Sequence, residues 1–294
     1  MKMAKIKGKE MRSIVTKGVC VGLLAIAGTV LYGSGASAAT FKVHCGSGPS
    51  IQDRLDRNAS GGDTIEVSGT CVENVVINVP GLSLVAQPGA QIVAADPNSP
   101  VVTVQAPRVR IIGFTISGGF DGIRVRNSGS AIISDNTVEN NYREGVNVVG
   151  SSHAQIEGNK IRHNGFDSNG NPVNRGHGIF VGQSSNAVIV SNEIDGNGDI
   201  GVRVADASAA RLNDNDVTDN QNDGIDVTLN SSVRLSDPST SPAAANRING
   251  NGGFGWRCRI NSSIWPEQNQ NYTGGNGLGN TSIESGCVKQ GLLF

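Results

Sequence analysis

Two sets of side chains recur at fixed distances from a repeated glycine in this sequence. The first set stands directly before the glycine, and its members are Asp121, Glu144, His177, Ile200 and Asp223. The second set stands two places after it, and its members are Arg124, Asn147, Phe180, Arg203, Asp226 and Arg257. An imidazole, carboxylates and guanidinium groups in one neighbourhood can move protons and neutralise an anion. These positions are therefore the candidates for chemistry.

The glycine belongs to an internal repeat, which indicates how these side chains are positioned. Its copies begin at Gly122, Gly145, Gly178, Gly201, Gly224 and Gly255. Each full unit carries three short apolar segments, of the types Gly-Ile-x-Val, Ala-x-Ile and Asn-x-Ile, separated by turns. Such segments fit neither a hairpin sheet nor a helix, and one unit cannot bury its own apolar residues. The sequence therefore predicts an all-β fold, a parallel β-helix solenoid with one unit stacked per turn.

Two columns of asparagine follow from the same repeat. The first column is Asn136, Asn159, Asn192, Asn215 and Asn246, and the second is Asn141, Asn164, Asn197, Asn220 and Asn251. Stacked side-chain amides hydrogen-bond along such a column, and asparagine tolerates left-handed turn conformations. We assign these asparagines a structural role and no chemistry.

Two units carry inserts. The insert "FDSNGNPVNR", residues 166–175, brings Phe166 and Arg175 just ahead of His177 and is placed to form the wall of a groove. The insert "DPSTSPAA", residues 237–244, is small and polar, and we expect it to be a plain surface loop.

The first 39 residues differ from the rest of the chain. Basic residues precede an apolar run at 19–32, and small residues with an Ala-x-Ala site follow, which is typical of a secretory signal. We expect residues 40–63 to form an N-terminal cap with a short helix, 64–263 the coils, and 264–294 an irregular C-terminal cap. The predicted product is a secreted protein, most simply a monomer, with no transmembrane anchor after the signal is removed.

The remaining chain is acidic and carries an even number of cysteines. The leader contains six of the 24 basic residues and one of the 25 acidic residues, so 18 basic and 24 acidic residues remain. This balance, without a basic stripe, argues against a nucleic-acid partner. The simplest pairing of the four remaining cysteines is Cys45 with Cys71 and Cys258 with Cys287, one disulfide at each end of the coils.

The repeat resembles that of the right-handed parallel β-helix superfamily, which includes pectate lyases, polygalacturonases, alginate epimerases and NosD-like periplasmic proteins. The likeness rests on the "GIxV" and "NxIxxN" units and on "DTIEVSGTCVENVVI", and covers roughly residues 50 to 263. It implies a right-handed solenoid. Polygalacturonase motifs occur only as Gly176-His177-Gly178 and around Asp223, in reversed order, and the D-P-H-D motif of alginate epimerases is absent.

The resemblance implies an exported protein that binds or modifies a polysaccharide, possibly an acidic uronate glycan by lyase or epimerase chemistry. In that hypothesis His177 is the base, Arg203 or Arg124 neutralises the sugar carboxylate, Tyr142 is the acid, and Glu144 also belongs to the catalytic group. The predicted substrate-binding residues are Asp121, Arg124, Asn147, Arg175 and Phe180. Asp223 and Asp226 are the candidate ligands of Ca²⁺.

Three alternatives stay open at this point. Glycoside hydrolysis needs two carboxylates at a defined separation, for which Glu144 and Asp121 are the best pair. The column of Arg203, Asp226 and Arg257 also fits a solvated ladder of ion pairs. Finally, the whole protein fits a non-catalytic structural or adhesive role at a surface.

Overall fold

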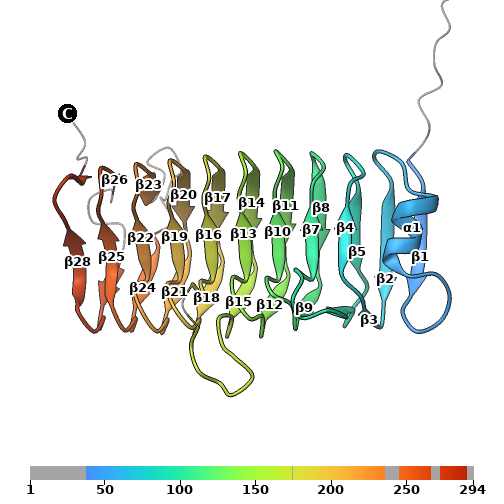
Figure 1. Cartoon of the computed structure of the whole chain (residues 1–294), viewed down its shortest axis with the longest axis horizontal. Helices are drawn as coiled ribbons and strands as arrows, with labels where there is room; N and C mark the ends of the chain where they lie inside the picture. Colours follow the sequence, from blue (N-terminus) through green and yellow to red (C-terminus); the bar gives the residue numbers. More distant parts are fainter. Residues whose placement is uncertain (1–37, 174, 236–244, 266–271, 290–294) are drawn as a thin grey trace, which may run out of the picture. The chain divides into compact units, whose positions relative to one another are not determined.

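The computed structural model describes residues 38–173, 175–235, 245–265 and 272–289. The unit that begins at Ala38 is a parallel β-solenoid built from three sheets, as the sequence predicts (Figure 1). Most of the leader, the insert 237–244 and the terminal "GLLF" lie outside the described residues. Among the described residues, no helix is long and apolar enough to span a bilayer.

Each coil contributes one strand to each sheet, and neighbouring coils pair in parallel. Sheet A contains β1 (Thr40–His44), β2 (Thr64–Ser68), β5 (Ser83–Ala86), β8 (Val109–Ile112), β11 (Ser130–Ser134), β14 (His153–Glu157), β17 (Asn186–Val190), β20 (Ala209–Asn213), β23 (Ser232–Leu235), β26 (Ser263–Trp265) and β29 (Val288–Lys289). Sheet B contains β3 (Thr70–Val72), β6 (Gln91–Val93), β9 (Thr115–Ser117), β12 (Thr137–Glu139), β15 (Lys160–Arg162), β18 (Glu193–Asp195), β21 (Asp216–Thr218), β24 (Arg247–Asn249) and β27 (Tyr272–Gly274). Sheet C contains β4 (Val75–Ile77), β7 (Val102–Val104), β10 (Ile123–Val125), β13 (Val146–Val148), β16 (Ile179–Val181), β19 (Val202–Val204), β22 (Ile225–Val227), β25 (Phe254–Cys258) and β28 (Gly279–Ile283).

The core is a set of apolar columns that the in-register pairing creates. On sheet C, for example, Val125, Val148 and Val181 are partners in successive strands, and all three are fully buried. Isoleucine and valine fill most of the other inward positions, and burying such a side chain stabilises by about 1.5–3 kcal/mol. Trp256 also occupies an inward position, with 4% of its surface exposed.

Both asparagine columns form the predicted hydrogen-bonded ladders at the turns. The Nδ2 group of Asn192 donates to Asn215 Oδ1 at 2.9 Å, and that of Asn197 donates to Asn220 Oδ1 at 2.9 Å. The second column extends one coil further than the sequence analysis indicates, to Asn276. These ladders fill the turn interiors with satisfied polar groups.

A third ladder, which the sequence analysis missed, consists of buried serines. Its members are Ser152, Ser185, Ser208, Ser231 and Ser262. The hydroxyls of Ser185, Ser208, Ser231 and Ser262 each accept a hydrogen bond from the backbone N–H of the serine one coil earlier, as at 3.1 Å from Ser185 N to Ser208 Oγ.

The repeat glycine is explained by lack of space beside the second asparagine ladder. A β-carbon on Gly178 would lie 2.6 Å from Ile194 Cγ2, 2.7 Å from the Gly201 carbonyl oxygen and 2.9 Å from Asn197 Nδ2. No side chain fits there, so the glycine marks the start of each unit at sheet C.

The N-terminal end is capped by the predicted short helix, α1 (Ile51–Arg57), which begins with a capping box of Ser50 and Asp53. The Glu73 carboxylate accepts hydrogen bonds from the first helical N–H groups, at 3.1 Å from Ile51 and 3.0 Å from Gln52. Strand β1 precedes the helix and pairs with β2, which the sequence analysis did not anticipate. The Cys45–Cys71 disulfide is present here, as predicted.

At the other end the strands continue beyond the point where the sequence repeat fades. Residues after 264 add β27, β28 and β29, each paired in parallel with the coil before it. The predicted Cys258–Cys287 disulfide joins the last two coils. The final strands are largely exposed, so this segment still ends the solenoid.

Candidate functional site

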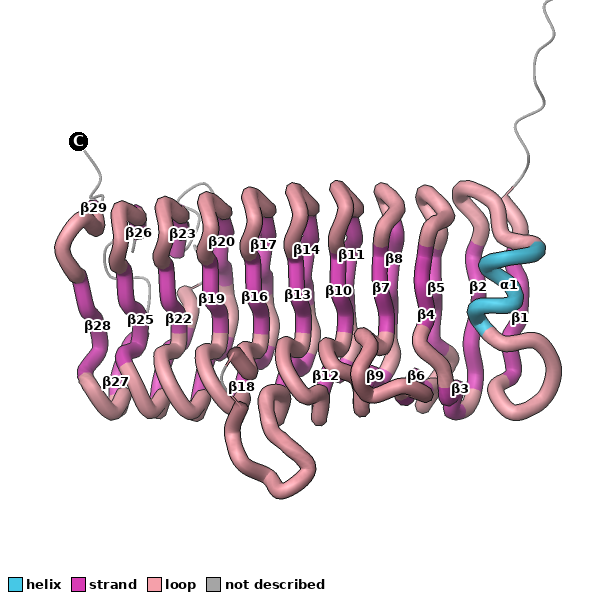
Figure 2. Tube along the Cα trace, viewed as in Figure 1, coloured by secondary structure: helices cyan, strands magenta, loops and turns pink. Residues whose placement is uncertain are grey.

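The predicted face lies where sheet B turns into sheet C, because the candidate columns stand at the start of the sheet C strands. Two of these connections are long: residues 94–101 between β6 and β7, and residues 163–178 between β15 and β16. The two connections between them, residues 118–122 and 140–145, are short. The insert stands out from the coils as a loop between β15 and β16 (Figure 2).

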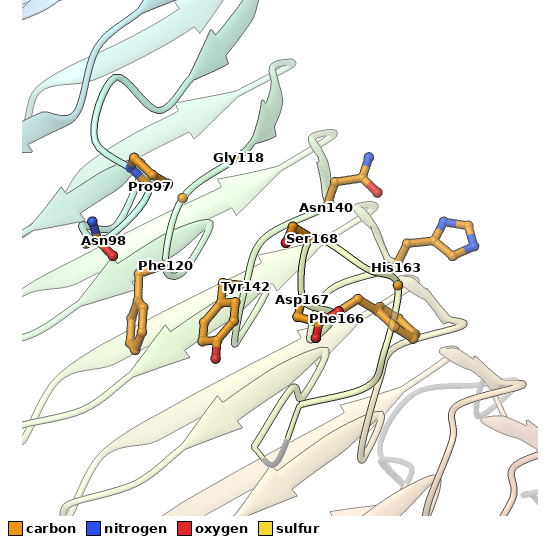
Figure 3. Close-up of a pocket in the computed structure, with 12 residues that line it drawn as sticks. Pro97, Asn98, Gly118, Phe120, Asn140, Tyr142, His163, Phe166, Asp167 and Ser168 are labelled. Carbon is orange, nitrogen blue, oxygen red and sulfur yellow. The ribbon is translucent and has the colours of Figure 1, made fainter.

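A cavity of about 890 Å³ occupies the space between the two long loops. Phe120, Asn140 and Tyr142 of the short turns line it together with Pro97 and Asn98 of the first loop. Phe166, Asp167 and Ser168 of the insert line it from the other side, with His163 nearby (Figure 3). The short turns are thus the floor of a groove, and the long loops are its walls.

Aromatic side chains gather in this groove although aromatics make up only 4% of the chain. The rings of Phe120 and Tyr142 have centroids 5.7 Å apart and are tilted by 30°. The Arg143 guanidinium lies 5.1 Å from the Phe120 ring centroid, within the range of a cation–π contact. Tyr142 is 44% exposed, so its ring is accessible to a ligand. Figure 3 shows Phe166 beyond Tyr142, on the insert.

The insert is held as a folded wall by its neck and by Asp167. A β-carbon on Gly165 would lie only 2.2 Å from the Gly176 α-carbon. The two chain segments at the base of the insert therefore pack backbone to backbone. The Asp167 carboxylate accepts hydrogen bonds from the backbone N–H groups of Asn171, at 2.8 Å, and Asn169, at 2.9 Å. These bonds, chiefly those from Asn171, lower the pKa of Asp167.

A second, smaller cavity of about 140 Å³ lies next to the insert, over the start of sheet C. The side chains that line it come from successive coils and are Arg143, Glu144, Arg175, His177, Phe180, Arg203, Ala205, Asp206 and Leu229. Five of the predicted site residues therefore do meet: Glu144, Arg175, His177, Phe180 and Arg203. Tyr142 does not join them, because it belongs to the larger groove.

His177, the predicted base, is buried, since only 1% of it is exposed. Its Nε2 atom is 3.5 Å from Arg203 Nη1, and its Nδ1 atom is 3.3 Å from Asp199 Oδ2. The backbone N–H of Ile200 also points at Nδ1, at 3.4 Å, so donors approach both ring nitrogens. Burial, reinforced by Arg203, Arg143 and Arg175, lowers the pKa of His177 well below its usual value. The ring is neutral and a weak base, which counts against the predicted role in proton abstraction.

Glu144 and Asp121 form a buried carboxyl pair. Their exposed fractions are 1% and 0%, and a hydrogen bond joins the two side chains. Burial, followed by the contact with Asp121, raises the pKa of Glu144 to about 9, so Glu144 carries the shared proton at neutral pH. Because both carboxyl groups are buried, a sugar cannot lie between them, so the glycoside-hydrolase alternative loses its best pair.

Arg124 and Asn147, two of the predicted substrate-binding residues, both bind Asp121 of this carboxyl pair. Arg124 Nε donates to Asp121 Oδ2 at 2.7 Å, and Asn147 Nδ2 donates to the same oxygen at 2.9 Å. Asn147 is 5% exposed, so its side chain is buried and does not point outward. Arg124 and Asn147 therefore support the buried carboxylates and do not face the groove.

Asp223 and Asp226, the predicted calcium ligands, are instead paired with arginines. Arg259 binds Asp226 through two bonds of 3.0 and 2.9 Å, and both Arg203 and Arg257 lie within 3.6 Å of that carboxylate. Arg257 also pairs with Asp223 at 3.1 Å. Among the described residues, no cluster of three acidic, histidine or cysteine side chains is arranged to hold a metal. Guanidinium groups occupy the positions that a cation would need, which argues against calcium here.

The chain matches the model of a known protein family. The family described as "Right handed beta helix region" matches residues 101–271, more than half of the chain. The chain belongs to the right-handed beta helix family. The expected handedness and superfamily are thereby confirmed.

Solved β-helix structures and one curated relative add context. The pectate lyase Pel9A aligns with a TM-score of 0.61 at 13% identity, over 88% of this chain and 80% of its own. An alginate lyase from Paenibacillus sp. str. FPU-7 aligns with a TM-score of 0.52 at 15% identity, over 85% and 99%. At such identities these likenesses show the fold alone. A cell surface glycoprotein of Methanothermus fervidus is 30% identical over 52% of this chain, which spans only 26% of that protein.

Several groove residues of this β-helix protein escaped the sequence analysis. Phe120, Asn98 and His163 line the cavity, but none of them was a candidate. Phe120 directly precedes the column residue Asp121, and an aromatic at that turn was the available signal. Asn98 lies in a loop that precedes the clear repeat, where the spacing gives no register.

Proposed function

We propose that this protein binds a polysaccharide in the groove between the loops 94–101 and 163–178, at an extracellular or cell-surface location. The observation that carries the proposal is the cavity of about 890 Å³ floored by Phe120 and Tyr142. Sugar rings present C–H faces that pack on aromatic rings, while their hydroxyls need polar partners. Asn98, Asn140 and Asp167 supply such partners at the groove edges.

An acidic, uronate-containing polysaccharide is the favoured ligand. Three arginines line the cavity next to the groove, and one of them, Arg143, also stacks on Phe120. The pectate lyase and alginate lyase neighbours are named for acidic polysaccharides, which makes pectate and alginate the first ligands to try. The cell surface glycoprotein relative supports the proposed location and a binding or adhesive role.

Lyase or epimerase chemistry is the second candidate, favoured by one observation. Glu144 lines the smaller cavity and keeps its proton at neutral pH, as a general acid must. The weak basicity of His177 ranks this candidate below simple binding. Ultraviolet absorbance of an unsaturated product, measured on pectate and alginate, tests for a lyase.

Affinity electrophoresis and calorimetry with pectate, alginate and neutral polysaccharides test the binding proposal. Replacing Tyr142 by Ala should weaken binding about tenfold, equivalent to roughly 1.4 kcal/mol, because a stacking ring is lost. Val72→Ala is the matched control, since Val72 is an exposed apolar residue on sheet B. Equal binding by wild type and Tyr142→Ala, or no binding to any polysaccharide, would overturn the proposal.

A further inference from the structure

The smaller cavity concentrates positive charge in an otherwise acidic protein. Arg143, Arg175 and Arg203 line it from three successive coils, against two lining acidic residues, Glu144 and Asp206. Two of the titratable lining groups carry no charge at neutral pH. Glu144 is protonated, because burial and Asp121 raise its pKa to about 9, and His177 is neutral.

The nearby carboxylates only partly neutralise these arginines. Arg143 Nη2 lies 2.7 Å from Glu144 Oε1, so its closest partner is a neutral acid. Arg203 lies 3.5 Å from Asp226, but that carboxylate is already bound by Arg259 and faces Arg257 as well.

The third arginine is the most available. Arg175 stands exposed at the end of the insert, and only its backbone N–H, not its guanidinium, contacts Asp199, at 3.2 Å. Asp199 also accepts from Asn222 and faces the His177 ring. The cavity therefore keeps a net positive charge at neutral pH.

Size limits what this cavity can hold. The cavity of about 140 Å³ is much smaller than the groove of about 890 Å³, so it suits a single charged substituent and not a stretch of polymer. Guanidinium groups converging on so small a space match the oxygens of a carboxylate or a sulfate.

We propose that the cavity of Arg143, Arg175 and Arg203 binds one oxyanion, carried as a carboxylate or sulfate group by the sugar next to those stacked in the groove. That the oxyanion belongs to a sugar next to the groove rests on the proposed function. Arg143 connects the two sites, because it lines the small cavity and also stacks on Phe120 of the groove floor. The ligand is then an anionic polysaccharide whose charged substituent enters beside the insert.

The first experiment tests the oxyanion site without any polysaccharide. Millimolar sodium sulfate should raise the melting temperature of the wild type more than that of the double variant Arg175→Gln/Arg203→Gln. Arg110→Gln, an exposed arginine on sheet A, is the matched control and should respond like the wild type. Equal stabilisation of the wild type and the double variant would refute the site, even if polysaccharides bind.

The second experiment identifies the source of the oxyanion. Calorimetry compares uronate oligomers, sulfated oligosaccharides and neutral oligosaccharides of equal length on the wild type and on Arg175→Gln. The preference for anionic over neutral oligomers should fall about tenfold in the variant. Whichever anionic oligomers bind more tightly to the wild type, uronate or sulfated, identify the oxyanion as a carboxylate or a sulfate. An unchanged preference would overturn the coupling of the two sites. Loss of all binding in Tyr142→Ala, with the sulfate effect intact, would separate the groove from the oxyanion site.

Discussion

The amide of Asn192 is saturated with hydrogen bonds inside the solenoid. Its Nδ2 group donates to Asn215, Ile156 and Val190, and its Oδ1 atom accepts from the backbone and side chain of Asn159. Removing it leaves several buried groups unpaired, each worth about 1–3 kcal/mol. We expect Asn192→Ala to lower the free energy of unfolding by about 3 kcal/mol or more, as measured by urea denaturation.

Asn186→Ala is the control for that measurement, because Asn186 is exposed on β17 and only its backbone takes part in the coil. Its unfolding free energy should stay within about 0.5 kcal/mol of the wild type. A similarly small change for Asn192→Ala would mean that water satisfies the ladder as well as the neighbouring amides do.

The proton on Glu144 makes folding stability depend on pH. Its pKa rises from 4.5 to about 9 on folding, so the unfolded chain loses this proton first. The contribution of Glu144 is fully present below pH 4.5 and is lost as pH rises to about 9, by at most about 1.4 kcal/mol for each unit. Glu144→Gln mimics the protonated acid, and the difference between wild type and variant isolates this slope from all other groups. A difference that is constant between pH 5 and 9 would show that Glu144 is ionised.

At the scale of elements, α1 protects the first strand of sheet C. Gln52 Oε1 accepts from the Val76 N–H at 2.8 Å, and its amide also lies 3.4 Å from the Val76 carbonyl oxygen. Val76 belongs to β4, the edge strand of that sheet. An unpaired edge of this kind recruits strands from other molecules. Gln52→Ala should therefore self-associate in sedimentation experiments at concentrations where Arg57→Ala, an exposed change on the same helix, stays unchanged.

The central coils and the last coil of the solenoid differ in how well the sequence predicts them. The central coils are readable because apolar residues, mostly valine, isoleucine and alanine, mark the inward strand positions. In the last coil the partners of buried Ile248, Trp256 and Ile264 are Thr273, Thr281 and Lys289. Polar residues at inward positions hide the strands from a pattern search, and they also explain why the stacking ends there.

The site was predictable as a face but not as an arrangement. Their fixed spacing from the repeated glycine placed Glu144, His177 and Arg203 on one side of the solenoid, and the three side chains do line one cavity. Whether a column residue points outward or is covered depends on the bulk of its neighbours in adjacent coils. His177 is covered beside Phe180, whose ring centroid lies 5.9 Å away, and the repeat alone carries no information about that packing.

At the scale of the whole molecule, each coil touches mainly the coils before and after it. Such an assembly is nearly one-dimensional, so local changes in one coil leave distant coils as they are. The long loops 94–101 and 163–178 can therefore vary in sequence without disturbing the ladders, since they leave the solenoid only at the turns from sheet B to sheet C.

The number of coils between those two loops sets the distance between them. Each coil adds one strand spacing of about 4.8 Å, so the distance between the loops is a whole number of such steps. The solenoid thus acts as a ruler graduated in coils. Duplicating or deleting one unit, such as residues 122–144, would change the distance between the loops by one strand spacing. Neither loop would need a single substitution.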